Sequence, residues 1–159
     1  MSRKPSLPLL VAFLVSGLVV SATALGGSAA TPSRAVVKVA FNKTLKRAIV
    51  VDAKGRTLYL LTSDSEGLPT CAKIDPSCPK LWPAFTSAGK PLARVGINGR
   101  LLGIVRGAGG SRQVTYNRHP LYYYSNDLKP GEVNGQACFG VWYVLTPKGI
   151  PIRKRGPQC

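Results

Sequence analysis

Short runs of apolar residues, separated by polar residues and turn formers, dominate the chain beyond residue 35. They are rich in β-branched and aromatic side chains, as strands are. The runs cover residues 36–41, 48–52, 56–61, 101–105, 112–117, 121–124 and 141–145. Beyond residue 30, no segment repeats apolar residues at helical spacing over the roughly 10 to 12 positions that a helix needs. The pattern therefore predicts an all-β domain.

Glycine, proline and asparagine mark the reversals between the runs, because glycine permits positive φ and proline presets φ. The reversals lie at 52–55, 98–99, 107–110, 117–120 and 147–149. Two of them close hairpins, over residues 48–61 and 112–124. In the run 56–61, Leu58 and Leu60 occupy one face and the opposite face is apolar as well. This favours a compact antiparallel fold, either a sandwich or a barrel-like sheet.

A tyrosine and an aspartate five positions apart occur twice, each time followed by a cysteine and a tryptophan. The first copy is Tyr59, Asp64, Cys78 and Trp82, and the second is Tyr122, Asp127, Cys138 and Trp142. The offset is 63 residues for the tyrosines and 60 for the tryptophans. Such periodicity predicts two tandem copies of one structural unit, over about 36–95 and 96–159.

The first 30 residues have the composition of a secretory signal peptide. Arg3 and Lys4 precede an uncharged apolar run over 7–20, and small residues follow it. This run is shorter than the roughly 20 residues that span a bilayer, although an uncleaved anchor is an alternative. No cysteine follows directly, so we expect no lipid anchor. Residues 31–159 then form a single secreted, extracytoplasmic β domain.

All four cysteines lie in the predicted domain, where export permits disulfides. They are Cys71, Cys78, Cys138 and Cys159. Three connectivities are possible. We favour Cys71 with Cys78, which closes a proline-containing loop, and Cys138 with Cys159, which fastens the C-terminal tail to the second repeat.

The chain is strongly basic. Removing Arg3 and Lys4 from its 22 lysines and arginines leaves 20 against six acidic residues, a net charge of about +14. The basic residues are spread along the chain, with one cluster at 153–155. Anionic cell-surface polymers or lipid headgroups are the expected partners, and a solubility role is the alternative. Nucleic acid is disfavoured by export and by the absence of a recognisable binding motif.

The repeated tyrosine and aspartate have two interpretations. Residues five apart in a strand lie about 16 Å apart on opposite faces, so a motif's own pair cannot touch unless the chain bends. We expect the rings of Tyr59 and Tyr122 in the core and the carboxylates of Asp64 and Asp127 fastening turns. The alternative is a ligand-binding Tyr/Asp site. Trp82 and Trp142 are expected as core anchors.

No catalytic or metal-binding constellation is recognisable. His119 is the sole histidine and falls within a predicted His-Pro turn, no Gly-x-Ser-x-Gly occurs, and the six carboxylates are scattered. Asp64 with Asp127 remains conceivable as a glycosidase pair. Tyr123, on the face opposite its neighbours, is expected to pack across strands, and a stacking, sugar-binding or cation–π surface with Arg112 and Arg118 nearby is the alternative. We expect neither enzyme activity, metal nor cofactor.

Several local motifs accompany the repeats: GRTLY at 55–59, LWP at 81–83, HPLYYYSND at 119–127, NGQ at 134–136 and VWY at 141–143. With these the chain resembles, over roughly 36–152, the secreted and often lipid-anchored bacterial repeat family with a Y-x4-D motif. The resemblance implies a tandem repeat in an exported envelope protein of unknown function. The chain departs from that family pattern in lacking a lipobox cysteine, in carrying Leu61 where an aromatic residue is frequent, and in the pair Cys138 and Cys159.

Together these observations predict an exported, non-catalytic β-repeat protein of the cell envelope or medium. We expect an interaction or structural module with affinity for anionic surface polymers. The alternative is an envelope protein that binds a ligand, or assists redox chemistry, through a Tyr/Asp surface site.

Overall fold

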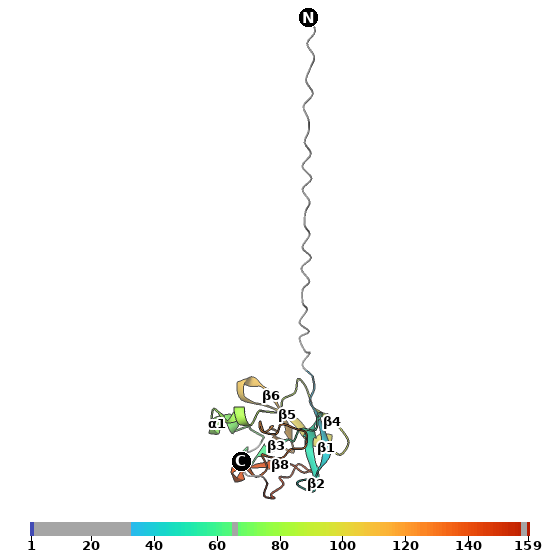
Figure 1. The fold of residues 1–159 in the computed structure, drawn as a ribbon, viewed down its shortest axis with the longest axis vertical. Helices are drawn as coiled ribbons and strands as arrows, with labels where there is room; N and C mark the ends of the chain where they lie inside the picture. Colours follow the sequence, from blue (N-terminus) through green and yellow to red (C-terminus); the bar gives the residue numbers. More distant parts are fainter. Residues whose placement is uncertain (2–32, 65–66, 157–158) are drawn as a thin grey trace. The chain divides into compact units, whose positions relative to one another are not determined.

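The computed structural model of the chain describes residues 1, 33–64, 67–156 and 159 (Figure 1). The strands are β1 (Val36–Asn42), β2 (Arg47–Asp52), β3 (Tyr59–Leu61), β4 (Leu92–Ala93), β5 (Leu102–Arg106), β6 (Arg112–Tyr116), β7 (His119–Pro120) and β8 (Trp142–Val144). The helices are α1 (Cys71–Ile74), α2 (Cys78–Leu81) and the 3-10 turns η1 (Gly99–Leu101), η2 (Ala108–Gly110) and η3 (Cys138–Gly140). The predicted signal peptide lies outside the described residues. Among those residues, no helix has the length and apolar character needed to cross a bilayer.

The strands form three small sheets that do not close into a barrel. Their orders are β2-β1-β4, β3-β8 and β5-β6-β7, and every pair is antiparallel except β1 with β4. In Figure 1 the β2-β1-β4 sheet lies on the side of the domain away from α1, with β3 and β8 between them. The all-β prediction is confirmed, and the strands lie in three small sheets that form no closed barrel.

Strand β3 divides the interior into two apolar clusters. Tyr59 and Leu61 pack into one cluster with the tryptophans, whereas Leu58 and Leu60 pack into the other. All four side chains are almost completely buried. Both apolar faces of the run 56–61 are therefore covered, and β3 contributes side chains to both clusters.

Three local predictions need correction. Residues 121–124 form no strand; Tyr122 makes isolated bridges with Tyr59 and Ala84 instead. The predicted His-Pro turn is strand β7, and the reversal is carried by Asn117 and Arg118, which both have positive φ. The short helices α1 and α2 were not predicted, because four residues each are too few to show helical periodicity.

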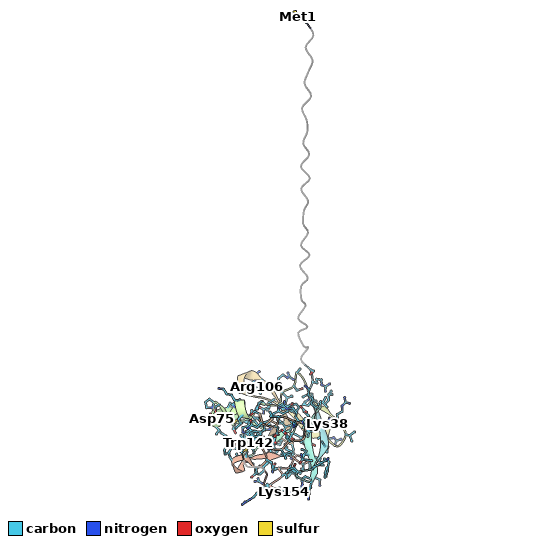
Figure 2. The ribbon with its side chains drawn as sticks, viewed as in Figure 1. Met1, Lys38, Asp75, Arg106, Trp142 and Lys154 are labelled. Atoms are coloured by element: carbon cyan, nitrogen blue, oxygen red, sulfur yellow. A yellow bond between two sulfur atoms is a disulfide. The ribbon has the colours of Figure 1, made fainter. Side chains whose placement is uncertain are left out.

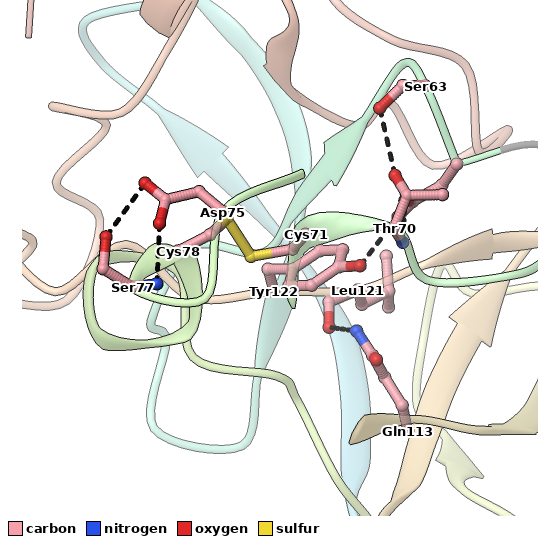
Figure 3. Close-up of a disulfide and its surroundings, with 10 residues drawn as sticks. Ser63, Thr70, Cys71, Asp75, Ser77, Cys78, Gln113, Leu121 and Tyr122 are labelled. Atoms are coloured by element: carbon pink, nitrogen blue, oxygen red, sulfur yellow. Dashed lines mark hydrogen bonds between the residues drawn. A yellow bond between two sulfur atoms is a disulfide. The ribbon is translucent and has the colours of Figure 1, made fainter. Parts of the chain in front are cut away.

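Disulfides fasten the two longest irregular segments. Cys71 is bonded to Cys78, which joins α1 to α2, and Cys138 is bonded to Cys159, which joins η3 to the C-terminus. These are the two pairs favoured from the sequence. Figure 3 shows the Cys71–Cys78 bridge beside the ring of Tyr122, so this staple lies against the second repeat's motif tyrosine.

Gly135 brings the backbone close to the aromatic core. A Cβ there would lie 2.7 Å from Cη2 of Trp82 and 2.9 Å from Cγ of Tyr124. We predict that Gly135→Ala lowers the free energy of unfolding by about 1–3 kcal/mol, because both rings are confined. Gly89→Ala is the matched control: its Cβ would lie 3.5 Å from Cγ of Arg34. Chemical denaturation should place the control within about 0.5 kcal/mol of the parent, and equal stabilities for both variants would contradict the packing.

Candidate functional site

The two motif tyrosines meet at the centre of the domain. Tyr59 and Tyr122 form an antiparallel bridge in which each backbone N–H donates to the other's carbonyl oxygen, both at 2.9 Å. This bridge extends the β3-β8 sheet toward the segment that follows β7. The equivalent residues of the two repeats are thus paired directly with one another.

The hydroxyl groups of these tyrosines cross between the repeats. The Tyr59 hydroxyl donates to Oδ2 of Asp127 at 2.6 Å, and the Tyr122 hydroxyl donates to Oδ2 of Asp64 at 2.8 Å. Each motif therefore supplies a donor to the other motif's carboxylate. The tyrosine and aspartate of one motif are too far apart in an extended strand to bond to each other, but each bonds to its counterpart in the other repeat.

The second oxygen of each aspartate fastens a chain reversal. Oδ1 of Asp64 accepts bonds from the backbone N–H and the hydroxyl of Thr70, both at 2.7 Å. Oδ1 of Asp127 accepts the backbone N–H of Asn134 at 2.9 Å. Each aspartate N–H also donates three residues back, to the carbonyls of Leu61 and Tyr124. Both carboxylates thus bridge a turn of their own repeat to the tyrosine of the other.

The tryptophans stack between the two tyrosines. The rings of Trp82 and Trp142 lie 3.9 Å apart at an interplanar angle of 3°. Tyr59 contacts Trp82 edge-on at 5.4 Å, and Tyr122 contacts Trp142 edge-on at 5.1 Å. The predicted core anchors therefore lie where the repeats join, and their contacts are reciprocal like those of the tyrosines.

The Tyr/Asp cluster is almost completely buried. Asp64 is 5% exposed and Asp127 is 6% exposed, while both tyrosines are buried more completely. Burial raises the pKa of both aspartates, against the opposing effect of their hydrogen bonds. Burial, followed by the neighbouring carboxylate, also raises the pKa of Tyr59 and Tyr122 above the usual value. These shifts favour the protonated form of both tyrosines.

His119 lies next to this cluster but outside its hydrogen bonds. Its Nδ1 is buried without a hydrogen-bond partner. Burial lowers the pKa of His119, and nearby Asp64 opposes that shift. Within residues 33–64, 67–156 and 159, no group of three or more His, Cys, Asp or Glu side chains could hold a metal ion.

The carboxylates of the described residues accept hydrogen bonds from uncharged donors. Asp52 accepts hydrogen bonds from the backbone N–H groups of Lys54 and Arg56 and from the Tyr123 hydroxyl. Asp75 accepts hydrogen bonds from the backbone N–H and the hydroxyl of Ser77. Glu132 accepts backbone and amide N–H groups. In the described part of the chain, no lysine or arginine side chain is among the donors to Asp52, Asp64, Asp75, Asp127 or Glu132.

The basic cluster 153–155 is held in place by a buried glutamine. Nε2 of Gln136 donates to the carbonyls of Ile152 at 2.5 Å and Lys154 at 2.7 Å, and Oε1 accepts the backbone N–H of Val144. Because the backbone is fixed, the three basic side chains project outward and are exposed. Figure 2 shows Lys154 extending away from the body of the domain. The Arg153 guanidinium lies 5.3 Å from the Tyr143 ring centroid.

Tyr123 packs against the core, and a cation lies over its ring, although it is not one of the two arginines considered from the sequence. Cζ of Arg56, not of Arg112 or Arg118, lies 4.0 Å from the centre of the Tyr123 ring. The Tyr123 hydroxyl donates to Asp52 at 2.8 Å, and burial raises its pKa. Tyr123 therefore packs at the rim of the second core cluster, with a cation over its face.

Sequence reasoning missed three features of this region. The crossed hydroxyl bonds could not be predicted from the repeat. A sequence repeat shows which residues occupy equivalent positions, but it does not show which of them contact one another. Gln136 stood inside the NGQ motif, but nothing in its sequence context indicated a complete burial. Phe139, at positive φ and exposed to solvent, carried no sequence signal at all.

Residues 103–146 match the model of a family described as a secreted repeat of unknown function. The match contains the second motif, with Tyr122, Asp127 and Trp142. It confirms the resemblance inferred from the sequence over this repeat, and the chain is accordingly a secreted protein. No curated protein and no solved structure matches the chain significantly.

The crossed geometry predicts a specific pattern of energetic coupling. In double-mutant cycles, Tyr59→Phe and Asp127→Asn should couple by about 1 kcal/mol or more, because the two groups share a buried hydrogen bond. Tyr59→Phe and Asp64→Asn, which belong to one motif, are the matched control and should couple by less than about 0.5 kcal/mol. Urea denaturation supplies the four stabilities of each cycle. Stronger coupling within a motif than between motifs would contradict the crossing.

Proposed function

We propose that this secreted repeat protein is a non-catalytic module that binds anionic polymers at the cell surface. The observation that supports this most strongly is the division of charge. The described carboxylates bond to neutral donors of the protein, while the lysines and arginines remain free of carboxylate partners among those same groups. The positive field of the domain is therefore directed outward.

The basic side chains are distributed over the domain and do not converge on one enclosed pocket. Figure 2 labels Lys38, Arg106 and Lys154 at separate places around it. A distributed field suits a long, flexible polyanion, which can follow many cations at once. The cluster 153–155 adds one local concentration, beside a cavity of about 480 Å³ that Tyr143 and Phe139 also line.

The motif residues support the non-catalytic part of the proposal. A general acid or base needs access to substrate and a pKa near the working pH. Tyr59 and Tyr122 have neither, since they are buried and their pKa values lie above the usual one. Asp64 and Asp127 use both oxygens in bonds to the protein itself. Their positions account for stability without a reaction.

Retention on heparin-agarose tests the proposal. Between about 0.1 M and 1 M NaCl the Debye length falls from about 10 Å to about 3 Å, so retention should collapse over this range. Neutralising the cluster in Arg153→Gln/Lys154→Gln/Arg155→Gln should weaken low-salt affinity about 10- to 100-fold, at roughly 1 kcal/mol for each cation near an anionic surface.

A matched triple variant separates the cluster from the net charge. Arg94→Gln/Arg100→Gln/Arg106→Gln removes the same charge from exposed positions on other elements. It should weaken retention less than the change at 153–155, because those cations are not clustered. Absent retention, or retention unaffected by salt, would contradict polymer binding.

A further inference from the structure

An apolar groove of about 360 Å³ lies on the surface above the stacked tryptophans. Trp82, Trp142 and Leu61 line it from the core, and Ile74 and Leu81 line it from the helices α1 and α2. Val141 and Phe139 line it from the segment around η3, and the polar part of its lining comes from Asp75 and Ser77. Two of its apolar side chains are strongly exposed: Phe139 by 74% and Ile74 by 64%. A water-facing groove flanked by such residues is a feature of binding surfaces.

The backbone that presents Phe139 is held in an unfavourable conformation. Phe139 has φ 50° and Ala137 has φ 60°, both in the left-handed region that non-glycine residues rarely adopt. The segment is fixed by the Cys138–Cys159 disulfide and by the Tyr143 hydroxyl, which donates to the carbonyl of Gly140 at 2.8 Å. The fold thus retains a strained backbone that exposes an aromatic ring. Such strain persists where the surrounding structure enforces it, and it is concentrated at functional sites.

Phe139 also separates the groove from a cluster of cations. On its other side lies the cavity lined by Tyr143, Arg153, Lys154 and Arg155. Among the described residues, Asp75 is the one carboxylate that lines the groove, and it lies in the turn between α1 and α2. An anionic group is therefore favoured at the 153–155 end, and an apolar chain is favoured between Phe139 and the helices.

We infer that this surface binds a single anionic amphiphile, an acyl or alkyl chain that carries a phosphate or carboxylate head. The chain lies in the groove over Trp82 and Trp142, and the head lies beside Arg153 and Lys154. The inference shares these cations with the proposed polymer binding, but its apolar groove is independent of that function. The juxtaposition of an apolar groove and a cluster of cations selects this ligand over a neutral lipid or a simple anion.

Intrinsic fluorescence reports on this site directly, because Trp82 and Trp142 are the chain's two tryptophans and both line the groove. The exported protein is titrated with dodecyl phosphate below its micelle concentration. Dodecyl maltoside supplies the same chain without the charge, and butyl phosphate supplies the charge with a short chain. We expect a saturable change with dodecyl phosphate and affinities at least roughly tenfold weaker for both controls.

Two phenylalanine variants separate binding from folding. Phe139→Asn removes the ring, and Asn adopts the left-handed region more readily, so Tm should be unchanged or raised while dodecyl phosphate affinity falls at least roughly tenfold. Phe41→Asn removes an equally exposed ring, 70% accessible, that does not line the groove, and affinity should not change. Arg153→Gln/Lys154→Gln should abolish the preference for dodecyl phosphate over dodecyl maltoside.

Each other outcome overturns the inference. No saturable change, or equal binding of butyl phosphate, would exclude the amphiphile, and unaltered affinity in Phe139→Asn would exclude the groove. Concentration-dependent dimers that Phe139→Asn dissociates would show that a second copy of the chain covers the groove. Heparin retention of the same variants distinguishes the two proposals: Phe139→Asn should keep its salt-dependent retention, and a failure of heparin binding leaves the fluorescence result unaffected.

Discussion

The fold depends on two hydrogen bonds that cross between its repeats. Each motif tyrosine donates to the other motif's aspartate, and each aspartate also holds a turn of its own repeat. Removing either partner would leave a buried polar group unsatisfied, which costs about 1–3 kcal/mol in a domain of modest net stability. The motif is repeated because each copy completes the other. In both bonds, the tyrosine donor belongs to one copy and the aspartate acceptor to the other.

This interior arrangement determines what the surface can do. Carboxylates that bond to tyrosines, hydroxyls and backbone N–H groups do not neutralise surface cations. In the described part of the chain, the lysines and arginines therefore have no partner among these carboxylates, which instead hold turns and tyrosine hydroxyls. Gln136 and the Cys138–Cys159 disulfide hold the backbone of the C-terminal segment. This places the basic cluster 153–155 beside Phe139, which is exposed and has a strained backbone.

Local pattern was sufficient for strands β1, β2, β3, β5, β6 and β8, for the two-faced core at Leu58 to Leu61 and for the disulfide partners. Alternation, turn formers and chain proximity express these features directly. It failed where the deciding contact is long-range. The run at 121–124 has strand composition, yet Tyr122 is engaged by single bridges to Tyr59 and Ala84. The identity of each aspartate's tyrosine likewise depends on how the repeats meet. Phe139 could not be anticipated, since its backbone conformation is imposed by neighbours and is disfavoured by its own side chain.

Observation of the buried hydroxyl protons by NMR tests the crossing most directly. Nuclear Overhauser spectra of the exported protein should show slowly exchanging hydroxyl protons for Tyr59 and Tyr122. The Tyr59 hydroxyl proton should contact the β-protons of Asp127, and that of Tyr122 should contact those of Asp64. Contacts of Tyr59 with Asp64 and of Tyr122 with Asp127, or hydroxyl protons in rapid exchange with water, would contradict the account.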